Sequence, residues 1–191
     1  EEEARGGAGV SEGGVSQSQK ARVDRVEWRK SFEEYRNKGM MEEAIQVAKQ
    51  KGGEEGLKAA EQCVDEWVKG MRRSEDAVKA CERHLGPEKA VAVAISRGNW
   101  AMGLDVAMRG APGLIDRVRE SHAEALWKVN KRGEAQALLI KAKKFEKAVD
   151  LWCEVGDWAN AIKVAEVHCK HKMQGVEERR REREATAVVP S

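Results

Sequence analysis

Proline, tyrosine and phenylalanine are scarce in this chain of 191 residues, which holds only 3 prolines, 1 tyrosine and 2 phenylalanines. Alanine, glutamate, lysine, arginine and valine dominate instead, and threonine is also rare. This composition disfavours β-sandwiches, β-barrels and collagen-like repeats, and it is typical of helical proteins. We therefore expect an all-α fold.

The chain also lacks an excess of charge of one sign and any long apolar run. Lys and Arg number 35 and Asp and Glu 33, for a formal net charge of +2. A protein that binds nucleic acid through bulk charge needs a strong basic excess, so we expect no nucleic-acid partner. No run approaches the roughly 18 apolar residues that cross a bilayer, which predicts no transmembrane segment. The chain opens on three glutamates rather than on methionine or a signal peptide, so we expect a fragment or a processed chain.

The cysteines show no framework spacing, so we expect reduced core thiols of a cytosolic protein. The nearest approach to a zinc site combines Cys153 with His168, Cys169 and His171, but it lacks a paired CxxC or an HExxH. Cys169 falls on an apolar helical stripe, which favours a core thiol beside two exposed imidazoles. His122 lies on another apolar stripe, which favours a packed histidine over a ligand or a catalytic base. We expect no enzyme, no metal and no cofactor, and a metal-dependent enzyme built on these four residues is the alternative.

Composition divides the chain into three parts. Residues 1–21 are rich in Gly, Ser and Gln without an apolar period, which predicts disorder. Residues 22–169 alternate short amphipathic helices with glycine-containing turns. Residues 170–191 form a charged tail, in which the arginines of 179–183 alternate with glutamates. That alternation favours a solvated helix over a phosphate-binding site.

Three segments of the middle part repeat one pattern: residues 39–48, 98–107 and 156–165 align. Their first glycines stand 59 and 58 residues apart (from 39 to 98 and from 98 to 156). We expect each glycine to end a helix in the left-handed conformation. A bulky residue two positions later would anchor the next helix, and a small residue three positions after that would let two helix backbones approach. The predicted packing residues are Gly39, Ala44, Gly98, Trp100, Gly103, Gly156, Trp158 and Ala161.

No single hairpin of this kind can bury its own apolar face, so the hairpins must stack. The sequence therefore predicts a tetratricopeptide-like, right-handed α-solenoid of antiparallel helical hairpins over residues 22–169. An isolated stretch of such repeats exposes apolar ends, which predicts self-association.

The stretch from Ala135 to Ala165, with Gly156-Asp-Trp-Ala-Asn-Ala-Ile162 at its end and Arg183-Glu-Ala-Thr186 beyond it, resembles the helical repeats of intraflagellar transport proteins. The resemblance is greatest to the family of the largest peripheral subunit of the intraflagellar transport B complex, and it covers roughly residues 90 to 186. It implies a non-enzymatic interaction scaffold with no catalytic residues to carry over. It also implies other intraflagellar transport subunits as partners, and the cilium or flagellum, its base and the cytoplasm as locations.

Two further classes share parts of this pattern. Helical repeats of vesicle-coat and sorting complexes use the same A-I-x-x-A spacing, so a segment of such a complex is an alternative. RNA binding through helical repeats is another alternative, and it would show a steep dependence on salt because phosphate contacts release counterions.

Overall fold

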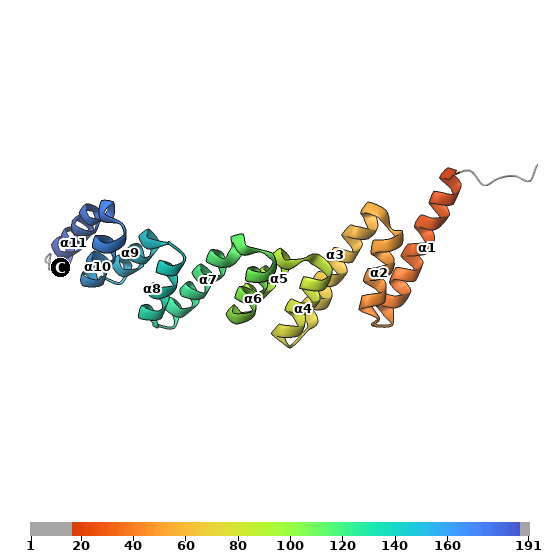
Figure 1. Ribbon diagram of the computed structural model, residues 1–191, viewed down its shortest axis with the longest axis horizontal. Helices are drawn as coiled ribbons and strands as arrows, with labels where there is room; N and C mark the ends of the chain where they lie inside the picture. Colours follow the sequence, from red (N-terminus) through yellow and green to blue (C-terminus); the bar gives the residue numbers. More distant parts are fainter. Residues whose placement is uncertain (1–16, 188–191) are drawn as a thin grey trace, which may run out of the picture. The chain divides into compact units, whose positions relative to one another are not determined.

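The computed structural model describes residues 17–187, with the side chains of residues 27–186. These residues form eleven α-helices and two 3-10 helices and contain no strand (Figure 1). The expected all-α class is confirmed. The helices are α1 (Gln17–Asn37), α2 (Met41–Lys51), α3 (Gly53–Gly70), α4 (Ser74–Leu85), α5 (Pro87–Ser96), α6 (Trp100–Gly110), η1 (Pro112–Leu114), α7 (Ile115–Lys128), α8 (Arg132–Lys141), α9 (Phe145–Glu154), α10 (Trp158–His168), η2 (Lys170–Lys172) and α11 (Met173–Ala187).

The chain divides into two compact units, one that ends at Trp67 and one that begins at Val68, with the boundary inside α3. In the second unit, helices that follow one another in sequence pack against one another from α4 to α11. The first helix begins at Gln17, ahead of the boundary expected at residue 22. Residues 1–16, where disorder is expected, lie outside the described residues.

Five turns share one backbone hydrogen-bond pattern. In each turn a residue in the left-handed conformation donates its amide to the carbonyl oxygen three residues back, and the next amide donates to the oxygen five residues back. All of these bonds are 2.9 to 3.0 Å long, and together they satisfy carbonyl groups that the end of a helix would leave unpaired. The left-handed residues are Gly39 (φ +75°), Gly98 (+67°), Asn130 (+63°), Lys143 (+55°) and Gly156 (+75°).

The turns at Asn130 and Lys143 are not among those predicted from glycine. α7 stops at Lys128, and Asn130 reverses the chain into α8. After the turns at residues 98 and 156, the next helix is capped by a side chain. Asn99 accepts from the amide of Met102 at 3.3 Å, and Asp157 accepts from the amide of Asn160 at 3.1 Å.

In the first unit, α1 packs on α2 through aromatic residues and small residues. Trp28 and Phe32 of α1 are buried and meet edge to face, with ring centroids 6.1 Å apart. Ala44 and Ile45 of α2 are fully buried. The start of α3 lies so close to the end of α2 that a Cβ on Gly56 would stand 2.0 Å from the carbonyl oxygen of Ala48. Only glycine fits there.

The second unit buries a continuous cluster beneath α7 to α11. Its fully or nearly fully buried members are Ala123, Ala135, Leu139, Ala148, Val149, Trp152, Cys153, Ala161, Val164, Ala165, Cys169 and Val176. Trp152 also donates its indole N–H to Oε1 of Gln136 at 2.7 Å, which satisfies the polar atom of this buried ring.

The described part of the charged tail, residues 170–187, is helical, but it is not wholly solvated. Val176 of α11 is fully buried in the cluster, and α11 packs on α9 and α10. The expectation of a solvated helix at 179–183 is therefore wrong for one face: Arg179 bonds Asp150 of α9 at 2.9 Å. A 3.6-residue period places Arg179, Arg180 and Arg183 on the same side of the helix as Val176, and Arg181 away from it.

Candidate interaction surface

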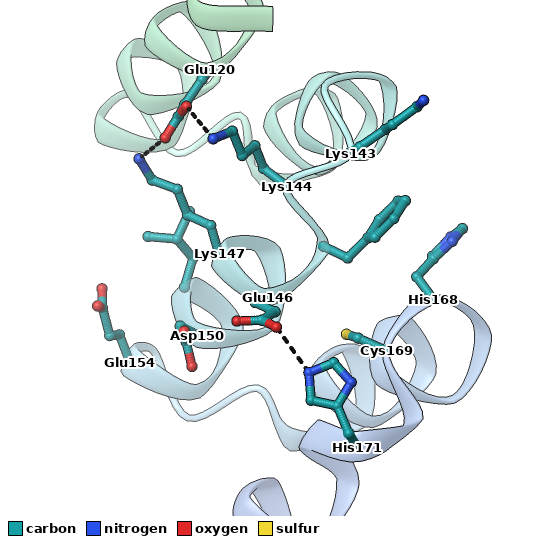
Figure 2. Close-up of a pocket in the computed structure, with 12 residues that line it drawn as sticks. Glu120, Lys143, Lys144, Glu146, Lys147, Asp150, Glu154, His168, Cys169 and His171 are labelled. Carbon is teal, nitrogen blue, oxygen red and sulfur yellow. Dashed lines mark hydrogen bonds and ion pairs between the residues drawn. The ribbon is translucent and has the colours of Figure 1, made fainter.

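The second unit contains a groove of about 570 Å³ with α9 as its floor (Figure 2). The end of α10 and η2 form one wall, and α7 with the α8–α9 turn forms the other. The groove is lined by Glu120, Lys143, Lys144, Phe145, Glu146, Lys147, Asp150, Leu151, Glu154, His168, Cys169 and His171.

The α7 wall is joined to α9 by a group of ion pairs. The ammonium of Lys147 bonds Glu120 at 2.7 Å and also bonds Glu124, and Lys144 lies 3.4 Å from Glu120. The bond from Lys147 lowers the pKa of Glu120 below its ordinary value of 4.5. Burial alone would lower the pKa of Lys147, but its bonds to the two carboxylates outweigh burial and raise that pKa. These pairs tie two neighbouring helices together at the edge of the groove.

The opposite wall holds His168, Cys169 and His171 of the predicted metal alternative, whereas Cys153 lies on α9 and does not line the groove. The structure gives each of the four another environment. His168 stacks on Phe145, with ring centroids 4.8 Å apart, and Nε2 of His171 lies 2.8 Å from Glu146. Cys153 and Cys169 are buried in the apolar cluster, and burial raises the pKa of both thiols. Within the described part of the chain, no three His, Cys, Asp or Glu residues stand where they could hold one metal ion.

Two charges at the edge of the groove take part in no ion pair with any described residue. Lys143 occupies the left-handed turn between α8 and α9, and Glu154 ends α9. Both side chains are exposed, and in Figure 2 they lie at opposite ends of the groove. The groove thus combines the aromatic ring of Phe145 with two unpaired charges of opposite sign. This combination suits the binding of a protein segment rather than chemistry on a small molecule.

The predicted packing residues do not form a common site. Gly39 and Ala44 belong to the first unit and the other six to the second. The three glycines at 39, 98 and 156 occupy left-handed turns, and Ala44, Gly103 and Ala161 are buried. A Cβ on Gly103 would stand 3.3 Å from Cβ of Ala94 on α5 and 3.4 Å from Val118 on α7, so α6 lies close to both helices there.

The two predicted tryptophan anchors are half-buried. Trp158 packs on the apolar cluster of the second unit. Trp100 stacks on His122, with ring centroids 5.0 Å apart and planes 10° from parallel. Burial lowers the pKa of His122, as suits a neutral packed imidazole.

His168, Cys169 and His171 on one wall of the groove stand out in the sequence, whereas the residues of the α7 wall do not. The signal for the α7 wall is the spacing of Glu120 and Glu124, four residues apart and therefore on one face of a helix. No local signal marks Lys147 as their partner, because 23 residues or more separate it from both carboxylates.

Comparison with known proteins gives a consistent set of relatives. The chain is 26% identical to intraflagellar transport protein 172 of Chlamydomonas reinhardtii over 155 residues, which is 81% of this chain and 9% of the relative. It is 27% identical to intraflagellar transport protein osm-1 of Caenorhabditis elegans over 150 residues, 78% of this chain and 8% of the relative. It is 30% identical to the intraflagellar transport protein 172 homolog of Danio rerio over 142 residues, 74% of this chain and 8% of that protein.

The chain thus spans less than a tenth of the length of these curated relatives. No protein-family model matches it, and a search of the solved structures finds no significant match. None of the described helices combines the length and the apolar character that crossing a membrane requires. The expected resemblance to intraflagellar transport proteins is confirmed by relatives from several species, and the chain is similar to one segment of intraflagellar transport protein 172 and its homologs.

Proposed function

We propose that this chain is a non-enzymatic segment of an interaction scaffold in the intraflagellar transport trains of cilia and flagella. The observation that carries the proposal is the similarity to intraflagellar transport proteins 172 and osm-1 along 74 to 81% of the chain. Its partners are then other subunits of the transport complex, and its locations are the cilium or flagellum, its base and the cytoplasm.

The helices are proposed to act as a right-handed α-solenoid of the tetratricopeptide type. Repetition of one turn geometry and of buried small residues at 44, 103 and 161 supports this architecture. In it, the eight predicted packing residues serve to hold neighbouring helices together and touch no partner. Exposed charges on the rigid stack then set which partner binds.

The groove over α9 is the surface of the second unit that we assign to a partner subunit. Its occupant is a protein segment with an acidic side chain to pair with Lys143 and a basic side chain to pair with Glu154. The ion pairs of Glu120 with Lys147 hold the edge of the groove in place before the partner arrives. Preorganisation of this kind lowers the entropic cost of binding.

The test is expression of the tagged full chain in ciliated cells, followed by imaging and affinity purification. We expect tag fluorescence in cilia and at their bases, and intraflagellar transport B subunits in the eluate. Recovery of vesicle-coat subunits without transport subunits would contradict the proposal.

A pair of charge exchanges tests the groove itself. Lys143→Glu with Glu154→Lys keeps the net charge and reverses the two unpaired charges, so it should reduce recovery of the partner. The matched control is Lys163→Glu with Glu166→Lys, an exchange on the exposed side of α10 that also keeps the net charge. Equal recovery with both variants would remove the groove from the proposal and leave the scaffold function in place.

A further inference from the structure

Three acidic residues lie on one face of α9, and basic residues from a later part of the same chain contact that face. Glu146, Asp150 and Glu154 are four residues apart, which places them on one face of the helix. From residue 171 on, the chain contacts them in the same order. His171 and Lys172 lie 2.8 and 3.7 Å from Glu146, and Arg179 bonds Asp150 at 2.9 Å.

The last contact in this series is Arg183, whose guanidinium donates to the backbone carbonyl oxygens of Glu154 at 3.2 Å and Cys153 at 3.5 Å. It therefore pairs with the negative end of the α9 dipole. The same guanidinium lies against the turn at Gly156, where a Cβ would stand 3.3 Å from its Nη1. Because the contacts run in the same order on both helices, α11 lies parallel to α9.

Charged contacts outnumber apolar ones where α11 meets α9. Among the side chains of α11 that the structure describes, Val176 is the only fully buried apolar one, and Met173 is half-buried. One and two turns after Val176, where a packed helix would continue its apolar stripe, stand Arg179 and Arg183. The Arg179 and Asp150 side chains are 42% and 38% exposed, and ion pairs of that exposure are individually weak.

The link that precedes α11 is short. Cys169 is buried in the apolar cluster and fixes the end of α10, and residues 170–172 form a single 3-10 turn before α11 begins. A swing of α11 about this turn withdraws Val176 from the cluster beneath it, and an α11 from a second copy would return the same side chain. A second copy of the chain carries the identical helix, with the same arginines at the same spacing.

We propose that α11 is an exchangeable strap, and that the acidic face of α9 binds α11 of a second copy of this chain as well as its own. Exchange of an identical element creates no new interface chemistry, which makes it a low-cost route to a dimer. The short link keeps the chain's own helix at a high effective concentration, so the chain on its own stays closed. Exchange becomes visible when the contact within one chain is broken and the contact between chains is left intact.

Two full-length variants separate these contacts. Asp150→Arg removes the acceptor on α9 and leaves α11 intact, whereas Arg179→Glu with Arg183→Glu removes the strap and leaves α9 intact. Neither variant alone keeps the pair of Arg179 with Asp150, in one chain or between chains, whereas the contacts of His171 and Lys172 with Glu146 remain in both. A mixture of the two restores two complementary pairs: one between the intact α11 of the first and the intact α9 of the second, and one between the reversed charges at position 179 of the second and position 150 of the first.

We expect α11 amides to exchange hydrogen roughly tenfold faster in each variant than in the unaltered chain. In light scattering after gel filtration, the mixture should contain a species with the mass of two chains, absent from either variant alone. The matched control for the strap variant is Arg180→Glu with Arg181→Glu, which changes the net charge equally at two arginines whose ion pairs, with Glu184 and Glu177, lie within α11. Combined with Asp150→Arg, it should give no such species.

If the α11 amides exchange hydrogen as slowly in Arg179→Glu with Arg183→Glu as in the unaltered chain, the proposal that these arginines hold α11 on α9 is contradicted. A mixture that stays monomeric would overturn the exchange, as would a two-chain species formed equally well with the control. Should Asp150→Arg fail to fold, the single-chain exchange Asp150→Arg with Arg179→Asp tests the same contact. It should restore slow amide exchange in α11, and failure to do so in a folded protein would contradict the proposal.

Discussion

The backbone amide of Lys144 donates to the carbonyl oxygen of Leu139 at 2.9 Å, and this bond closes α8 around Lys143 in the left-handed conformation. A side chain in that conformation costs roughly 1–2 kcal/mol, because Cβ crowds the following carbonyl. Lys143→Gly should therefore raise the free energy of unfolding by about 1 kcal/mol after the added entropy of the unfolded chain is counted. Urea unfolding followed by circular dichroism measures this change.

Asn130→Gly serves as the graded comparison. Asparagine tolerates the left-handed region better than lysine does, so the gain in unfolding free energy should be smaller. A loss of stability in both variants would show that the side chains stabilise these turns.

Gly156→Ala should destabilise the protein by about 1–2 kcal/mol. The φ of Gly156 is +75°, and the new Cβ would also approach the guanidinium of Arg183. Gly133→Ala is the control, because Gly133 lies in α8 with no atom within 4 Å of a Cβ built there. That control should be neutral or stabilising, since alanine is the better helix former. Equal losses in both variants would count against a special role for the turn.

The pair of Glu120 with Lys147 predicts a loss of stability in acid. The pKa of Glu120 is lowered in the folded protein, so the unfolded chain binds the proton more readily. The stabilisation is therefore present above the ordinary pKa of 4.5 and disappears as the pH falls through the lower, folded value. Glu120→Gln should flatten this part of the curve of melting temperature against pH, while Asp116→Asn on an exposed part of α7 should leave it steep.

The cysteines should resist alkylation while the protein is folded. All four thiols are buried, and burial raises the pKa of Cys63, Cys153 and Cys169. Because the thiolate is the reactive form, a maleimide reagent at neutral pH should react slowly with the native chain and rapidly in urea. Mass spectrometry of the products gives the modified residues, and rapid native labelling of Cys153 would show that the core beneath α11 opens often.

The sequence predicts most of the fold because the apolar period and the glycines are local signals. Gly39, Gly98 and Gly156 predict the positions of their turns, because only glycine adopts the left-handed conformation without cost. Asn130 and Lys143 take the same conformation against their preference, and tertiary packing of the flanking helices imposes it. No inspection of residues 128–144 alone could have revealed both.

The groove and the strap depend on residues far apart in sequence, which limits what their spacing can reveal. Arg179 meets Asp150 across 29 positions, and the run of alternating charges that contains it is also typical of a solvated helix. Val176 distinguishes this helix from a solvated one. It stands three residues before Arg179 and gives one side of an otherwise polar helix an apolar residue that can be buried.

The five shared turns leave side-chain identity largely free but fix the number of residues between them. Each added or deleted residue rotates the rest of a helix by about 100°. A single insertion within α8 or α9 would therefore carry the charged side of the next helix into the core, whereas many substitutions would leave every contact in phase. We therefore expect substitutions along this chain to be tolerated more often than insertions or deletions within its helices.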